Sequence, residues 1–146
     1  MQKSSRAGGA GLSRHVYSAG IYARLSVDSD GDKNESIETQ IEIAKAYING
    51  RNDMVLFDCY TDIGKTGTNF RREGFERMMQ DVRMRKIDCI IVKDLSRFGR
   101  NHIETGSYLE KIFPFMGVRF IAVTDCFDSM NISGQNETLG VNLKNL

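Results

Sequence analysis

An arginine and a serine stand two residues apart at the end of a short apolar segment, where Arg24 and Ser26 close the sequence Ile-Tyr-Ala-Arg-Leu-Ser. Side chains of an extended chain alternate between its two faces, so this guanidinium and this hydroxyl are predicted to share a face. A serine hydroxyl is a weak nucleophile until neighbouring groups stabilise the charge that develops during attack. The pair therefore indicates either a nucleophilic serine beside a cation or, without any chemistry, a serine that begins a turn.

Further arginines later in the chain favour the chemical interpretation. Arg72 follows a loop rich in Gly and Thr, whereas Arg97 and Arg100 come soon after an unbroken apolar run. Arginine stays protonated and its planar fork matches phosphate oxygens, so a convergent set would stabilise the pentacovalent state of phosphoryl transfer. Because arginine is not a metal ligand, the predicted reaction uses a serine nucleophile and no metal. The alternative is that these arginines pair with acidic residues of the first predicted helix.

Charge is unevenly distributed along a chain whose net charge is +1. Residues 27–58 carry 3 basic and 8 acidic side chains, whereas residues 61–101 carry 10 basic and 6 acidic ones. A polyanion is therefore expected to meet the second region. Further candidates there for contacts with phosphate groups are Lys65, Arg71 and Lys93.

Alternating strand and helix patterns must position these residues. Apolar runs and helical periodicity predict strands at residues 18–25, 54–60, 87–92 and 118–123, and helices at residues 37–48, 72–86 and 103–113. This alternation is typical of an α/β fold, here a three-layer, mainly parallel open sheet of four to five strands with helices on both faces. Ligands of such folds gather at the carboxyl ends of the strands, which places Ser26, Arg72 and Arg97 at one edge.

Several local features refine this outline. Ser36 is predicted to cap the first helix, and Pro114 and Gly117 to close the third. Gln40 lies in the first turns of the first helix, so its amide could reach back toward the serine, although spacing alone favours a solvated amide. Residues 61–71 are predicted to form a loop.

Two other kinds of site are not supported by the sequence. The triplet Gly64-Lys65-Thr66 resembles the end of a Walker A motif, but Cys59 occupies the position of the required first glycine. The three cysteines form no CxxC pair and only two histidines accompany them, which argues against a zinc site and for free thiols.

The length of 146 residues fits a single domain. We expect residues 1–17 to be a flexible leader and residues 18–146 to be one catalytic domain that stops at the start of a long helix near residue 139. No apolar run is long enough to cross a membrane or to form a signal peptide, which indicates a cytoplasmic protein.

Three ordered motifs resemble the catalytic domain of the serine recombinases, the resolvase and invertase family. They are YARLS at residues 22–26, GTNFRREGF at residues 67–75 and VKDLSRFGRN at residues 92–101. The second and third are most similar to the large serine recombinases, which include integrases and transposases. The resemblance extends from about residue 18 to the end of the chain.

This resemblance implies site-specific DNA recombination in which Ser26 attacks a DNA phosphate, giving a 5'-phosphoserine link and a free 3'-hydroxyl. Strand exchange and reversal of this step need no ATP, metal or other cofactor. The catalytic residues that it implies beside the serine are Arg24, Gln40, Arg72, Arg97 and Arg100. It further implies double-stranded DNA as a partner, a homodimer or tetramer of the full-length protein, and weak DNA binding with little or no activity for the fragment alone.

The chain departs from the small relatives at one position of the third motif. Those relatives carry an aspartate just before the first arginine, where this chain has Ser96. Asp94 is the candidate to replace that carboxylate.

Two alternative functions remain open from the sequence. A non-catalytic DNA-binding or assembly module of the same fold would leave Ser26 idle, but it has no need for convergent arginines around one hydroxyl. A receiver-like phosphate-binding domain needs a cluster of acids at the strand ends, and Asp58 and Asp62 are too isolated in sequence to form one.

Overall fold

The computed structural model describes residues 14–26, 36–64, 72–98 and 102–132. Its strands and helices are β1 (Tyr17–Ser26), α1 (Ile37–Asn49), β2 (Met54–Gly64), α2 (Glu73–Arg83), β3 (Cys89–Val92), α3 (His102–Ser107), α4 (Phe113–Met116), β4 (Arg119–Ala122) and β5 (Phe127–Asp128). Short 3-10 turns cover Leu95–Arg97 and Ser129–Ile132, and π-helical turns at Tyr108–Ile112 join α3 to α4.

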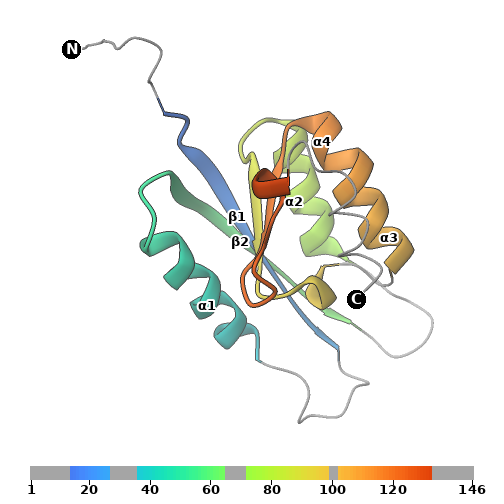
Figure 1. Cartoon of the computed structure of the whole chain (residues 1–146). Helices are drawn as coiled ribbons and strands as arrows, with labels where there is room; N and C mark the ends of the chain where they lie inside the picture. Colours follow the sequence, from blue (N-terminus) through green and yellow to red (C-terminus); the bar gives the residue numbers. More distant parts are fainter. Residues whose placement is uncertain (1–13, 27–35, 65–71, 99–101, 133–146) are drawn as a thin grey trace.

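The strands form one sheet in the order β2-β1-β3-β4-β5. The first four are parallel, and β5 pairs antiparallel with β4. Helix α1 covers one face, while α2, α3 and α4 lie on the other (Figure 1). The predicted three-layer, mainly parallel α/β fold is thus confirmed. Short β5 lies outside the predicted strands, and its pairing with β4 rather than its own pattern makes it a strand.

A single aromatic ring organises the larger of the two cores. Phe98 is fully buried and its ring centroid lies 5.4 Å from that of Phe75, 5.5 Å from that of Phe113 and 5.0 Å from that of Phe120. These rings come from α2, α4 and β4, so Phe98 is packed against both helical elements and the sheet. Because Phe98 directly follows Arg97, this packing fixes the segment that carries that arginine.

Helix α1 begins and packs as its sequence predicts. The Ser36 hydroxyl accepts a hydrogen bond from the Thr39 amide at 3.1 Å, which satisfies one of the free N–H groups of the first turn. Ala44 and Ile48 are buried against β1 and β3 in the second, smaller core. The amphipathic stripe thus sets the helix directly over the central strands.

Strand β2 is longer than predicted. It continues through Gly64, although residues 61–64 were predicted to belong to a loop, and it stays paired with β1 until Ser26 faces Gly64. The polar stretch is stable as a strand because β1 supplies its hydrogen-bonding partners. This extension brings Asp62 opposite Arg24.

The end of the third helical segment also differs from the prediction. Pro114 does not close it, since α4 runs through Met116 and ends at Gly117, whose φ of 72° is the left-handed conformation that glycine favours. The π turns explain the difference. The amide of Phe113 bonds to the carbonyl of Tyr108, five residues back, and this wider turn accommodates the proline ring that follows.

Asp62 joins the sheet to the start of α2. It is only 7% exposed, and its carboxylate accepts hydrogen bonds from the Tyr22 hydroxyl at 2.8 Å, the Gly74 amide at 2.7 Å and the Phe75 amide at 2.9 Å. Burial and the neighbouring carboxylate raise the pKa of Tyr22, so its hydroxyl remains a proton donor. Asp62 therefore caps α2 from another element, at an N-terminus where the Arg72 side chain makes no capping bond.

The Asp62→Asn variant tests this contact. An amide cannot accept all three hydrogen bonds and carries no charge to stabilise the helix N-terminus, so we expect unfolding to become easier by about 2 kcal/mol. The measurement is urea unfolding followed by circular dichroism. The control is Asp58→Asn on the same strand, whose side chain is 49% exposed and pairs with Arg77 in solvent, and which should change stability by less than about 0.5 kcal/mol. Equal effects of the two variants would contradict the capping role.

A second prediction concerns the close approach of α2 to β2. A methyl group at Gly74 would collide with the backbone of Thr61, whose nitrogen would lie 2.9 Å away. We expect Gly74→Ala to destabilise the fold by about 1–3 kcal/mol through this overlap. The matched control is Gly50→Ala, where the nearest atom would be the Ala46 oxygen at an ordinary 3.6 Å. A Gly74 variant as stable as the Gly50 variant in thermal unfolding would show that the helix can shift freely.

Candidate active site

Gln40 holds the last part of β1 in place. Its Oε1 accepts a hydrogen bond from the Arg24 amide at 3.1 Å, and its Nε2 donates to the Arg24 carbonyl at 3.0 Å. The side chain is fully buried, so the prediction of a solvated amide, which the spacing favoured, is wrong. By satisfying both backbone groups of Arg24, this amide fixes the strand two residues before Ser26.

Arg24 and Arg97 bind each other's backbone. The Arg24 guanidinium donates from Nε to the Arg97 carbonyl at 3.3 Å and from Nη2 to the Ser96 carbonyl at 2.9 Å. Arg97 Nη1 in turn lies 3.4 Å from the Arg24 carbonyl. The turn that carries Arg97 is anchored further by the Leu95 amide, which donates to the Asp125 carboxylate at 2.8 Å. The two arginines, far apart in sequence, therefore occupy one site.

Arg72 reaches the same site from the start of α2. Its Nη1 lies 3.0 Å from Glu104 Oε2, and its Nη2 donates to the Phe98 carbonyl. The guanidinium carbon stacks over the Phe75 ring, 3.9 Å from its centroid. The side chain is only 8% exposed, so Arg72 is held rigidly next to the Arg97 segment.

The three guanidinium groups interact electrostatically. Burial lowers the pKa of Arg24, and the positive charges of Arg72 and Arg97 lower it further. Arg97 Nε is buried without a hydrogen bond among the described residues and lies 4.0 Å from the Asp94 carboxylate. Concentrated positive charge with remaining donor capacity is suited to an anion such as a phosphodiester.

Asp94 is the residue expected to replace the aspartate that the small relatives carry before the first arginine of the third motif. The Ser96 hydroxyl donates to Asp94, and Lys93 Nζ lies 3.0 Å from it. Burial alone would raise the pKa of Asp94, but these two contacts and the charge of Arg97 lower it, so the group is ionised at neutral pH. Lys93 is thus ion-paired at the edge of the cluster.

Several predicted site residues fall outside the described part of the structure. Ser26 is described only as the final residue of β1, paired with Gly64, and its side chain is not described. Those that fall wholly outside are Lys65, Arg71 and Arg100.

Two carboxylates at this edge, Asp62 and Glu104, were not predicted from the sequence. Asp62 was judged too isolated, because its proximity to Tyr22 and α2 depends on the unexpected length of β2. Glu104 carries no motif-level signal. It lies three residues before Ser107 in a short helix, and only the position of that helix beside Arg72 indicates a role for it.

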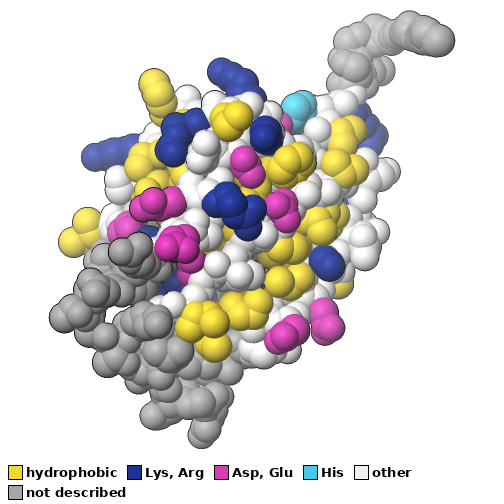
Figure 2. Space-filling model, turned by 180° about the vertical axis from the view of Figure 1, so that it is seen from behind, with side chains coloured by type: hydrophobic (Ala, Val, Ile, Leu, Met, Phe, Trp, Pro, Cys, Tyr) yellow, Lys and Arg dark blue, Asp and Glu magenta, His cyan; other side chains and the backbone are white. Residues whose placement is uncertain are grey.

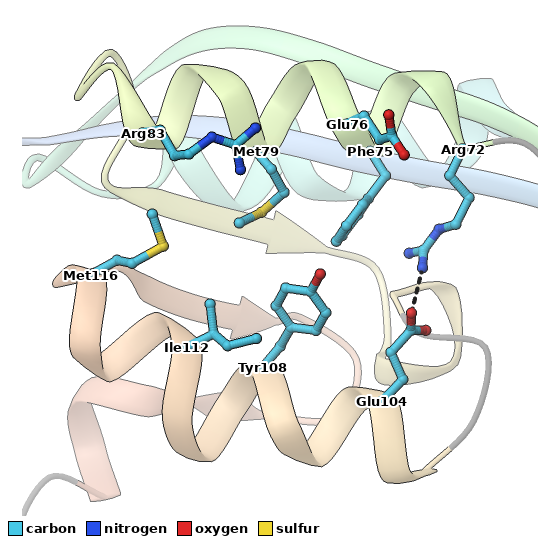
Figure 3. Close-up of a pocket in the computed structure, with 9 residues that line it drawn as sticks. All are labelled: Arg72, Phe75, Glu76, Met79, Arg83, Glu104, Tyr108, Ile112 and Met116. Carbon is cyan, nitrogen blue, oxygen red and sulfur yellow. Dashed lines mark hydrogen bonds and ion pairs between the residues drawn. The ribbon is translucent and has the colours of Figure 1, made fainter.

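A groove of about 650 Å³ borders the cluster between α2 and the α3 to α4 segment (Figure 3). Its apolar lining consists of Phe75, Met79, Tyr108, Ile112 and Met116, and its charged lining consists of Arg72, Glu76, Arg83 and Glu104. The Arg72–Glu104 ion pair lies at one end (Figure 3), so the groove adjoins the arginine cluster.

One face of the protein mixes charges of both signs (Figure 2). On the face seen in Figure 2, basic and acidic side chains are interspersed among hydrophobic ones.

Within the described ranges, no three His, Cys, Asp or Glu side chains are grouped to hold a metal ion. No helix of the described residues has the length and apolar character to cross a membrane.

Comparisons with known proteins agree with this geometry. The family model for the resolvase N-terminal domain matches residues 19–141. A resolvase family site-specific recombinase from Streptococcus pneumoniae is 31% identical, with a TM-score of 0.64 over 88% of this chain and 89% of that one. A search of curated sequences found no match.

Two further crystal structures share the fold. The N-terminal catalytic domain of TP901-1 integrase has a TM-score of 0.68 at 24% identity, covering 86% of this chain and 89% of that one. The C-terminal catalytic domain of ISC1926 TnpA, an IS607-like serine recombinase, has a TM-score of 0.56 at 29% identity, covering 72% and 69%. With the family model matching most of the sequence, the chain belongs to the resolvase family of serine recombinases.

Proposed function

We propose that this chain cleaves and rejoins DNA at specific sites through a covalent phosphoserine intermediate, with Ser26 as the nucleophile. The observation that supports the proposal is the convergence of Arg24, Arg72 and Arg97 near the end of β1, the strand whose final residue is Ser26. Donors already held by backbone carbonyls and aromatic packing are preorganised for a phosphate.

In the proposed reaction, Ser26 Oγ bonds to phosphorus as the bond between phosphorus and the 3'-oxygen breaks. The serine loses its proton and the 3'-oxygen gains one, so the products are a 5'-phosphoserine ester and a free 3'-hydroxyl. One phosphoester replaces another, and the reverse attack rejoins DNA without ATP. The arginine cluster stabilises the extra negative charge of the pentacovalent state.

The proposal extends to the remaining predicted residues. Gln40 orients Arg24 through its backbone, Arg100 joins the cluster, and Lys65, Arg71 and Lys93 contact flanking DNA phosphates. The catalytic unit comprises residues 18–146 and acts on double-stranded DNA in the cytoplasm as part of a homo-oligomer, with no cofactor.

Ser26→Ala tests the nucleophile. Full-length protein is incubated with duplex DNA containing its recombination site, and covalent adducts are resolved on a denaturing gel. We expect the wild type to form an adduct and the variant to form none, because no hydroxyl remains to attack the phosphate.

The matched control is Ser96→Ala, which removes the other serine hydroxyl of this edge while leaving the backbone carbonyl that binds Arg24. It should retain the adduct. An adduct that persists in the Ser26 variant would place the nucleophile elsewhere. Absence of an adduct in the wild type would favour the non-catalytic module.

Arg97→Lys tests the guanidinium geometry. Lysine keeps the charge but cannot contact the Arg24 carbonyl and a phosphate at once through a planar fork, so we expect adduct formation to slow by about 10²-fold or more. Arg77→Lys is the control, since Arg77 is exposed and pairs with Asp58 away from the cluster. Single-turnover rates that fall equally in both variants would argue against a specific role for Arg97.

A further inference from the structure

Arg72 is held both by neutral groups and by a carboxylate. The Phe98 carbonyl and the Phe75 ring fix its position. The Glu104 carboxylate at 3.0 Å neutralises it (Figure 3). The first two contacts would survive the loss of the third. The guanidinium can therefore change its anionic partner without changing its place.

Glu104 brings its charge into the arginine cluster from the first turn of α3. Its side chain is 29% exposed, against 8% for that of Arg72, so the carboxylate has solvent beside it. Its charge acts beyond Arg72. It partly offsets the effects that lower the pKa of Arg24, and, after burial, it helps to raise the pKa of the Tyr108 hydroxyl.

A carboxylate on a guanidinium uses the same donors that a phosphate would use. Two anions cannot share the Nη1 donor of Arg72 without strong repulsion. A phosphate that takes this donor of Arg72 therefore displaces Glu104, and the nearby solvent gives the released carboxylate a polar environment.

We propose that Glu104 is a placeholder for the DNA phosphate: it occupies Arg72 in the DNA-free protein and is displaced when DNA binds. The inference rests on the proposed function, because it takes Arg72 to be a phosphate ligand. Glu104 thereby neutralises Arg72 and keeps it ordered while lowering the affinity of the cluster for DNA. It is a positioning residue that acts through Arg72.

The test is binding of a short labelled duplex of mixed sequence to the full chain by fluorescence anisotropy, at several salt concentrations. Glu104→Gln keeps the shape and one acceptor for Arg72 but removes the charge. We expect it to bind DNA roughly three- to tenfold more tightly at low salt. A merely structural role for Glu104 would instead weaken binding.

Salt dependence gives a second, independent readout. In the wild type, displacement frees a carboxylate that attracts a cation from solution, which offsets the cation released from DNA. Without that carboxylate, the slope of log K against log salt should steepen by up to about 0.9, because cation uptake no longer offsets the cation released at this one phosphate contact. The control is Glu110→Gln, which removes an exposed charge from the same helical segment and should change affinity and slope less.

Arg72→Gln separates failure of this inference from failure of the proposed function. If it does not weaken DNA binding, Arg72 is not a phosphate ligand and both proposals are overturned at this residue. If it weakens binding but Glu104→Gln binds no more tightly than Glu110→Gln, only the placeholder role is overturned. Tighter binding and a steeper slope specific to Glu104→Gln support it.

Discussion

The arrangement at the carboxyl edge of the sheet depends on the buried carboxylate of Asp62. Its oxygens accept hydrogen bonds from the Tyr22 hydroxyl of β1 and from two backbone amides of α2. A buried charge is stable only while such partners remain, so β1, β2 and α2 keep one relative position. Arg24 lies two residues after Tyr22, and Arg72 directly precedes α2. The same contact therefore fixes the backbone positions from which both arginine side chains extend.

Burying arginines together has an electrostatic cost, since burial and then the charges of Arg72 and Arg97 lower the pKa of Arg24. Backbone carbonyl oxygens offset part of it by accepting the guanidinium hydrogens, and the carboxylates of Asp94 and Glu104 offset more. The protein meets this cost when it folds. A reacting phosphate that enters the cluster then finds oriented donors, with little reorganisation left to make.

Much of the architecture was predictable because burial leaves a regular pattern. The strands before Ser26 and Lys93 are apolar runs, and α1 shows a clean stripe. Gln40 lies three residues after Ile37 and four before Ala44, which places it within that stripe. The period therefore pointed to burial, and the polarity of the side chain was wrongly given more weight.

What could not be predicted depends on pairing between distant segments. The polar end of β2 is typical of a loop, and only its pairing with β1 makes it a strand. Strand β5 is only two residues long, and it is fixed by β4 and by the ion pair between Arg119 and Asp128 at 2.6 Å. The role of Glu104 depends on Arg72, its partner 32 positions away in the chain, and no local pattern indicates it. The edge rule for parallel sheets did bring Arg24, Arg72 and Arg97 to one region, because it depends on topology alone.

The anchors of this arginine cluster are mostly carbonyl oxygens, from Ser96, Arg97 and Phe98. Every amino acid has a carbonyl oxygen, so these hydrogen bonds do not depend on which side chain stands at the anchoring position. Residue 96 is exposed and can exchange its side chain while its main chain continues to hold Arg24. This position therefore tolerates substitution although its main chain is structurally important, so sequence variability would underestimate its importance.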